Sequence, residues 1–266
     1  MRRRFVWLGI LGVMVAIVGG KFFLFAQNDR ACGEPIPEAV SFVEIAEEPL
    51  IQDSRPDPID NTDNDPIDQS AKEPLTQDLP PSINLSVPFT SQAPQANWDL
   101  PYQEACEEAS VLMVDWYYKG VEEISIEEAD RAILDLITFE EEQGLPIDLT
   151  GGELAELIQD YFGYTKVEVL ENPSIESLKE HLSARRPVIV PAAGRLLENP
   201  HFRSPGPIYH MFVLRGYMDN VFITNDPGTR HGEAYLYPFD TVYHAMHDWN
   251  GGEVEIGAKQ VVVIYP

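Results

Sequence analysis

The chain has 266 residues, of which 44% are hydrophobic, and its formal net charge at pH 7 is −26. This length fits one domain with additional segments, or two small domains. The strong negative charge argues against nucleic acid as a partner, because binding to phosphates requires clustered Lys and Arg side chains. The only two cysteines, Cys32 and Cys106, exclude a disulfide-rich scaffold and a cysteine-rich zinc site.

The N-terminus has the pattern of an export signal. Arginines occupy positions 2–4, and residues 5–26 form an apolar run that only Lys21 interrupts. About 20 apolar residues span a bilayer, and basic residues mark the cytoplasmic end of such a segment. We therefore expect residues 1–26 to be a single-pass signal anchor in the cell membrane, with the rest of the chain extracellular. If the segment is cleaved instead, the protein is secreted.

The segment after the apolar run differs in composition from the remainder of the chain. Residues 27–82 are rich in Asp, Glu and Pro and contain few aromatic residues. A segment of low hydrophobicity and high like charge cannot bury enough apolar surface to fold. We expect residues 27–82 to be a disordered, extended linker and residues 83–266 to be the folded domain.

The hydrophobic periodicity of this domain changes along the chain from helical to strand-like. Apolar residues at 105, 109, 112, 113 and 116, for example, follow the spacing of one buried helix face. Helices followed by antiparallel strands indicate an α+β domain. In chain order, we predict a strand over 83–90, helices over 104–119, 126–137, 152–162 and 174–186, a strand over 188–192, a hairpin of strands 210–217 and 221–225, a helix over 238–247, and a strand over 260–265.

Cys106 falls in the first turn of the most regular predicted helix. Free backbone N–H groups and the positive end of the helix dipole stabilise a thiolate at this position. The thiolate is the nucleophilic form of cysteine. A buried, inert cysteine at a helix start is an equally ordinary interpretation when Cys106 is considered alone.

Two further residues supply the groups that a nucleophilic cysteine needs. His210 lies at the start of the first hairpin strand, and Asp226 follows the second strand. Antiparallel pairing places the start of one strand beside the end of the next, so the sequence predicts that the imidazole and the carboxylate are neighbours. Alone, each residue fits an ordinary role, in a strand or in a turn. The three residues together indicate nucleophilic catalysis.

At this point the chain resembles the peptidase C39-like family, which comprises papain-like cysteine peptidases related to bacteriocin-processing peptidases. The resemblance covers nearly all of residues 83–266 and none of the linker. The motifs that carry it, in order, are Val87-Pro88-Phe89-Thr90-Ser91-Gln92, Ala105-Cys106-Glu107-Glu108-Ala109-Ser110, His210-Met211-Phe212-Val213-Leu214-Arg215-Gly216-Tyr217 and Asn225-Asp226-Pro227-Gly228.

The resemblance implies a papain-like fold in which the nucleophile helix packs on an antiparallel sheet. It also implies that Cys106 is the nucleophile, His210 the general base and acid, and Asp226 the residue that orients the imidazole. The oxyanion hole would use the Cys106 N–H and a glutamine side chain. Gln92 matches the family's glutamine, whereas Gln103 is nearer in sequence to Cys106; we favour Gln92.

One departure from the family pattern follows the cysteine. Where a small pair such as Gly-Pro is common, this chain has Glu107 and Glu108. Carboxylates beside a thiolate raise its pKa, but neighbouring helix residues point in different directions. We therefore expect both side chains to point away from Cys106 and to have a modest effect, such as reduced activity or a preference for basic substrates.

The sequence thus predicts a membrane-tethered cysteine peptidase that acts on a peptide or protein substrate through a thioester, without a cofactor or a metal. One alternative is an acyl transferase or deamidase, and another is a non-catalytic peptide-binding module on the same fold. A Cys32–Cys106 disulfide is a further alternative that an oxidising exterior permits. The histidines at 201, 231, 244 and 247 have no metal-binding spacing, and we interpret them as ordinary surface or partly buried residues.

Overall fold

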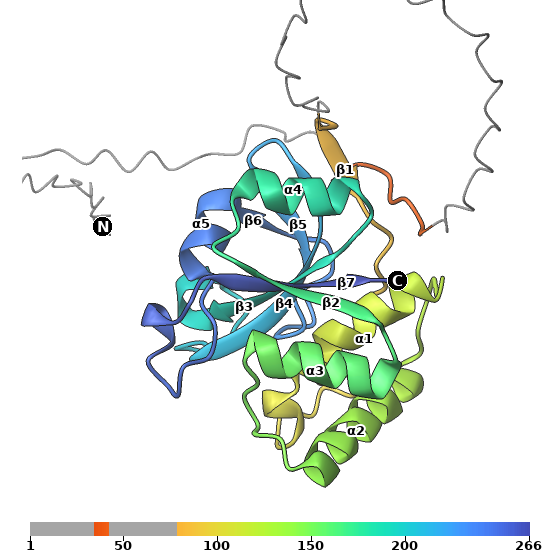
Figure 1. The fold of residues 1–266 in the computed structure, drawn as a ribbon, viewed down its shortest axis with the longest axis vertical. Helices are drawn as coiled ribbons and strands as arrows, with labels where there is room; N and C mark the ends of the chain where they lie inside the picture. Colours follow the sequence, from red (N-terminus) through yellow and green to blue (C-terminus); the bar gives the residue numbers. More distant parts are fainter. Residues whose placement is uncertain (1–34, 43–78) are drawn as a thin grey trace, which may run out of the picture. The chain divides into compact units, whose positions relative to one another are not determined.

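The structure, a computed structural model, describes residues 35–42 and 79–266 (Figure 1). The predicted membrane segment over residues 1–26, Cys32 and most of the predicted linker lie outside the described residues. Within the described ranges, no helix is both long and apolar enough to cross a membrane. The described residues 36–42 and 79–266 belong to one compact unit.

Serine and threonine side chains cap several of the helices. Ser125 accepts a hydrogen bond from the Glu128 N–H while the Glu128 side chain accepts one from the Ser125 N–H, and Thr150 forms the same capping box with Glu153. Such caps satisfy backbone groups that a helix start leaves free. The helices that the structure describes are α1 (Cys106–Tyr118), α2 (Ile126–Gln143), α3 (Gly151–Phe162), α4 (Ile175–Ser183), α5 (Phe239–Ala245) and the short 3-10 helices η1 (Tyr102–Glu104), η2 (Gly194–Leu197) and η3 (Val254–Ile256). All five predicted helices are confirmed, and α2 continues beyond the predicted end at residue 137.

In the described part of the chain, seven strands of different lengths form one antiparallel sheet, and the helices pack against it (Figure 1). The strands are β1 (Ser82–Asn84), β2 (Lys166–Glu171), β3 (Val188–Ala193), β4 (Tyr209–Met218), β5 (Val221–Asn225), β6 (Tyr235–Pro238) and β7 (Gln260–Tyr265). Their order is β2-β7-β3-β4-β5-β6, and β1 pairs with β4. The α+β class is confirmed, as is the hairpin of β4 and β5, whereas β2 and β6 were not predicted.

The predicted strand over residues 83–90 was wrong beyond Asn84. Only Ser82–Asn84 pairs with β4 as a strand. Leu85 still donates its N–H to the Arg215 carbonyl at 2.7 Å, but Pro88 has no N–H to continue such a ladder. The chain therefore leaves the sheet and runs toward Gln92 without regular structure.

Residues 35–42, which belong to the predicted linker, lie against this departing segment. The Val40 N–H donates to the Asn84 carbonyl at 2.8 Å, and the Ser86 N–H donates to the Val40 carbonyl at 2.9 Å. The Phe42 ring meets the ring of Tyr118 edge to face, with centroids 5.1 Å apart. A short part of the acidic stretch thus contributes a bridge and an aromatic contact to the domain.

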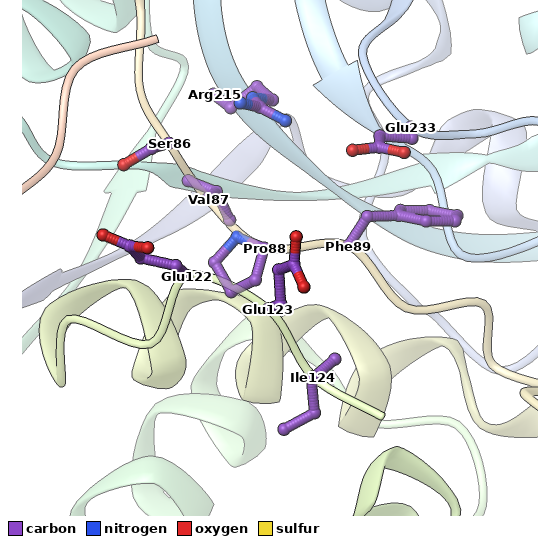
Figure 2. A pocket seen from close by; sticks show the side chains of 9 residues that line it. All are labelled: Ser86, Val87, Pro88, Phe89, Glu122, Glu123, Ile124, Arg215 and Glu233. Atoms are coloured by element: carbon purple, nitrogen blue, oxygen red, sulfur yellow. The ribbon is translucent and has the colours of Figure 1, made fainter. Parts of the chain in front are cut away.

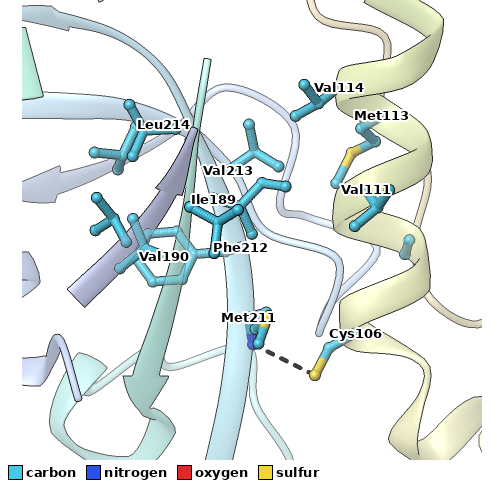
Figure 3. Packing of buried hydrophobic residues seen from close by; sticks show 14 of the residues in the cluster. Cys106, Val111, Met113, Val114, Ile189, Val190, Met211, Phe212, Val213 and Leu214 are labelled. Carbon is cyan, nitrogen blue, oxygen red and sulfur yellow. Dashed lines mark hydrogen bonds between the residues drawn. The ribbon is translucent and has the colours of Figure 1, made fainter. Parts of the chain in front are cut away.

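Helix α1 is buried along nearly its whole length and packs on β4 (Figure 3). Apolar side chains such as Val111 and Met113 meet side chains of β3 and β4, including Ile189 and Val213. Burial of this apolar surface stabilises the domain at about 25 cal/mol per Å². Because α1 has almost no solvent-facing side, its polar residues are buried too.

Candidate active site

The β4–β5 hairpin brings His210 and Asp226 together. His210 is the second residue of β4, and Asp226 directly follows β5. The His210 Nε2 atom lies 2.8 Å from the Asp226 Oδ1 atom, and both side chains are buried. The contact that the sequence predicted from strand pairing is therefore present, and it leaves Nδ1 as the imidazole nitrogen available for another partner.

Asp226 accepts further hydrogen bonds from three other groups. Its Oδ1 atom accepts one from the Gly228 N–H at 3.0 Å, and its Oδ2 atom accepts from the Tyr237 hydroxyl at 2.6 Å and from Asn199 Nδ2 at 3.2 Å. Burial alone would raise the pKa of Asp226, but the His210 charge and these hydrogen bonds outweigh it and lower the pKa below its usual value. Asp226 is therefore a fixed, ionised carboxylate.

The His210 imidazole is enclosed by aromatic rings and by one glycine. The Phe202 ring lies edge to face with it, at 5.2 Å between centroids, and the Phe212 ring is stacked at 6.2 Å. A Cβ atom at Gly228 would lie 2.8 Å from His210 Cε1, so only glycine permits this close approach. The imidazole plane is thus held by packing as well as by Asp226.

Cys106 is the first residue of α1 and lies against β4 next to His210. The backbone N–H of Met211, the residue after His210, donates to Cys106 Sγ at 3.3 Å (Figure 3). That N–H is free for the sulfur because β5 already ends opposite Val213. The structure therefore places the predicted nucleophile at the edge of the strand that carries the predicted base. Cys106 is a free cysteine.

The Cys106 thiol bonds to Glu107 instead of His210. Sγ lies 2.9 Å from Glu107 Oε2, and no hydrogen bond joins Sγ to the His210 ring among the described residues. Our expectation that Glu107 points away from Cys106 was wrong, since α1 has no solvent-facing side at this turn and the carboxylate is only 2% exposed. Burial, with the charge and hydrogen bond of Glu107, raises the pKa of the Cys106 thiol well above its usual value.

Glu108 is also buried, but it faces a different partner. It forms a carboxyl–carboxyl hydrogen bond with Glu140 of α2. Burial and the neighbouring carboxylates raise the pKa of Glu108 well above its usual value, and burial raises the pKa of Glu140 to about 7. Two adjacent carboxyl groups out of water share a proton, because both cannot carry a charge. The expected preference for basic substrates therefore has no exposed carboxylate at this turn to support it.

The two candidate oxyanion glutamines occupy different environments. Gln92 is buried, and its Nε2 atom donates to the carbonyls of Tyr102 and Gln103 at 2.9 and 2.8 Å. Its own N–H donates to the Pro227 carbonyl at 3.0 Å. Gln103 is exposed, and its amide donates to Glu104. Gln92 thus links the turn before Cys106 to the loop after Asp226, whereas Gln103 makes no such connection.

Sequence reasoning missed three residues of this site, Asn199, Tyr209 and Tyr237, and misjudged the direction of Glu107. Asn199 and Tyr237 hold Asp226, and Glu107 and Tyr209 border the nucleophile. The Tyr209 hydroxyl donates to the Leu149 carbonyl at 2.8 Å, and the Tyr209 hydroxyl oxygen also lies 3.1 Å from Asp248 Oδ1. Asn199 and Tyr237 reach the site from a loop and an edge strand, for which the sequence gives no signal. The adjacency of Glu107 to Cys106 was visible, but its burial was not.

The histidines that sequence analysis considered as metal ligands form no metal site among the described residues, although the His201 N–H donates to Asn199 Oδ1 at 2.9 Å. Among the described residues, no three His, Cys, Asp or Glu side chains are arranged to hold a metal ion. The rings of His201 and His231 lie 4.7 Å apart. A cavity of about 300 Å³ lies beside the loop that follows the C-terminus of α1 (Figure 2). It is lined by Ser86, Val87, Pro88, Phe89, Glu122, Glu123, Ile124, Arg215 and Glu233.

A comparison with models of known protein families identifies one family. A family model described as the Peptidase C39 like family matches residues 84–251. No curated protein matches the sequence. Solved structures that match include the crystal structure of a protein from Bacillus anthracis that is proposed to be a C39-like peptidase. It has 18% sequence identity and a TM-score of 0.46, and the match covers 70% of this chain and 98% of that chain.

Proposed function

Because the chain belongs to the peptidase C39-like family, we propose that it is a cysteine peptidase that hydrolyses a peptide or amide bond through a thioester. The observation that carries this proposal is the position of Cys106 at the start of α1, against the backbone of Met211, while the preceding residue His210 is held by Asp226. Nucleophile, base and orienting carboxylate therefore come from elements that fix them relative to one another.

The proposed reaction begins with proton transfer from the Cys106 thiol to Nδ1 of His210, the nitrogen that does not bond to Asp226. The thiolate attacks the substrate carbonyl, the C–N bond breaks, and the imidazolium donates its proton to the leaving amine. Water then loses a proton to His210 and attacks the thioester, the C–S bond breaks, and the thiolate regains the proton. Asp226 stays ionised and stabilises the imidazolium throughout.

Two groups near Cys106 are proposed to stabilise the oxyanion. The first N–H groups of a helix have no acceptor within it, so the N–H of Cys106 is suited to this role. Gln92 is the better of the two glutamines, because its amide is buried in the turn before Cys106. To donate to an oxyanion, Gln92 would have to release one of the two carbonyls that its amide now binds.

A non-catalytic peptide-binding module is the second candidate, and one observation favours it. The thiol bonds to Glu107 rather than His210, which opposes thiolate formation. An acyl transferase or deamidase would use the same residues as the peptidase and differs only in the acceptor. For location, we propose that residues 1–26 tether the domain outside the cell, on the grounds of their basic and apolar pattern alone.

The test is turnover by the purified full-length chain on a mixed peptide library, read by mass spectrometry and compared with a Cys106→Ala variant. We expect new peptide termini that are absent with the variant, and a mass shift on Cys106 from a trapped acyl group. Products that carry an added amine in place of water would identify a transferase. Absence of products and of any adduct on Cys106 would favour the binding module.

A further inference from the structure

Glu107 is fixed between the nucleophile and the loop before α3. Its Oε2 atom bonds to Cys106 Sγ at 2.9 Å, and its Oε1 atom accepts the Leu149 N–H at 3.3 Å. Both carboxyl oxygens are therefore occupied, and the side chain has almost no contact with solvent. Other residues of α1 that carry charge do not touch the sulfur: Glu108 bonds to Glu140, and Asp115 pairs with Lys119.

We propose that Glu107, through its hydrogen bond with the sulfur, favours the protonated thiol of Cys106 and sets the pH above which the reactivity of Cys106 stops rising. The proposal rests on the proposed function in one respect, namely that Cys106 is the nucleophile. The sulfur and the carboxyl group form a pair that shares protons, so they lose them in two steps that belong to the pair rather than to either residue.

The first proton leaves the pair at the carboxyl group. Burial raises the pKa of Glu107 to about 8, with a further contribution from the Asp148 charge, while the thiol pKa is raised well beyond its usual value. Below about pH 8 Glu107 is neutral, and the thiolate fraction of Cys106 rises tenfold per pH unit, as for any thiol. Above it, the new carboxylate charge opposes a second negative charge on the adjacent sulfur.

The consequence is a thiolate fraction that stops rising near pH 8. Once Glu107 has lost its proton, the pair keeps one remaining proton, which is divided between sulfur and oxygen in a ratio that does not depend on pH. A free thiol, in contrast, continues to ionise up to its own pKa. The reactivity of Cys106 should therefore level off near pH 8, a pH at which the thiolate fraction of an ordinary cysteine is still rising.

Other titratable groups also surround the pair. Asp148 in the loop before α3 and Asp248 in the loop after α5 are acids whose pKa values are raised by burial. Tyr209 of β4 has a pKa raised well above its usual value by burial and by Glu107, so it stays neutral. His210 of β4 and Glu108 of α1 also adjoin the pair, and variants can separate their contributions.

The experiment measures the rate of iodoacetamide labelling of Cys106 from pH 6 to pH 10 by mass spectrometry, using the full-length chain. We expect the rate for the natural sequence to level off above about pH 8, the pKa of Glu107. In Glu107→Gln, which keeps an oxygen for the Leu149 N–H, the rate should continue to rise. It should be about tenfold above the natural rate at pH 9 and within threefold of it at pH 6.

Glu108→Gln is the matched control, since it removes a buried carboxyl group from the same turn without touching the sulfur. We expect it to level off as the natural sequence does, as should a His210→Ala variant. A natural rate that rises tenfold between pH 8 and pH 9 would overturn the proposal, and so would a rate that is equally low at every pH. The pH profile of the natural sequence is measured without a variant, so a folding defect in Glu107→Gln cannot obscure it.

Labelling and turnover test different statements. A chain that cleaves no peptide but shows the levelling at pH 8 has lost the proposed peptidase function and kept the proposed role of Glu107. A chain that cleaves peptides but shows no levelling has the proposed peptidase function, and the proposed role of Glu107 is then wrong. Where turnover is limited by the thiolate fraction, Glu107→Gln should let the rate continue to rise above about pH 8.

Discussion

The two sides of the candidate site differ in how completely their polar groups are satisfied. On the base side, formed by His210, Asp226, Asn199 and Tyr237, each carboxylate oxygen of Asp226 accepts two hydrogen bonds. On the nucleophile side, formed by Cys106, Glu107, Glu108 and Glu140, three carboxyl groups are buried, and none forms an ion pair with a cation among the described residues. One oxygen of Glu108 and one of Glu140 are buried without a partner.

The base side is preorganised, whereas the carboxyl groups of the nucleophile side gain and lose protons as the pH changes. A buried carboxylate with four donors is held ionised in one geometry, which suits a residue that orients a base. Buried carboxyl groups without cations keep protons instead, and their ionisation changes with pH. The base side is thus set by the fold, whereas the state of the nucleophile side depends on pH.

The largest effect expected from this comparison is the loss of His210. His210→Ala removes the proposed proton acceptor while Asp226 keeps its other three donors, so we expect turnover to fall by about 10³-fold. The measurement is the rate of peptide cleavage, and His244→Ala in α5, which is exposed, is the control that should retain full activity. Retained turnover in His210→Ala would mean that another group, such as Glu107, accepts the thiol proton.

The next effect concerns stability and comes from the Glu108–Glu140 pair. Burial raises the pKa of Glu140 in the folded protein to about 7, above its value of about 4.3 in an unfolded chain. The folded state therefore binds more protons than the unfolded state between these values, and stability falls as pH rises through this window. We expect a loss of the order of 3 kcal/mol between pH 4.5 and pH 8.

Urea denaturation across this pH range measures the effect. The Glu140→Gln variant should have a flatter profile, because its amide does not titrate. The exposed Glu142→Gln on the same helix should keep the natural slope. A stability that rises with pH in the natural chain would show that this pair is ionised and stabilised by groups other than those described.

A smaller effect distinguishes the two glutamines. Gln92→Ala removes the amide that links the turn before Cys106 to the loop after Asp226, and with it a proposed oxyanion donor. We expect turnover to fall by about 10- to 100-fold. Gln103→Ala should change it by less than about threefold, because the Gln103 side chain is exposed and donates to Glu104, while the backbone carbonyl that Gln92 binds is kept in the variant. Equal losses in both variants would remove Gln92 from its proposed role.

How much of this could be predicted from the sequence differs between the two sides. The hairpin of β4 and β5 is a local element, so pairing alone placed His210 beside Asp226. Helical spacing likewise placed Cys106 at a helix start. The edge strands β2 and β6 escaped prediction because edge strands bury fewer side chains. β2 has no fully buried residue and pairs with the distant β7.

Glu107 could not be placed from the sequence for a related reason. The helical pattern indicated one buried face, whereas α1 is enclosed by the sheet, α2 and the loop before α3 and has no face left for a carboxylate to reach water. Burial on all sides is a property of the assembled domain rather than of the helix. Tyr237 and Asn199 could not be predicted for the same reason, since both reach Asp226 only after distant segments have come together.

The smallest effect tests whether the base side is as firmly set as its hydrogen bonds imply. In Tyr237→Phe, Asp226 loses its shortest hydrogen bond, at 2.6 Å, and keeps those from His210, Gly228 and Asn199. A hydrogen bond to a charged group contributes about 1.5–3 kcal/mol, and we expect a loss of stability at the low end of this range. The pKa of Asp226 should rise, so the acid limb of the activity profile should move to higher pH while turnover at pH 7 falls only a few-fold.

Tyr243→Phe is the control, since Tyr243 is a partly exposed tyrosine of α5 remote from Asp226. Urea denaturation and a pH profile of turnover measure both predictions together. A variant with natural stability and an unmoved acid limb would mean that the remaining three donors suffice. Asp226 would then be fixed by His210, the Gly228 N–H and Asn199, and the contrast with the nucleophile side would depend on burial of the glutamates rather than on the number of donors.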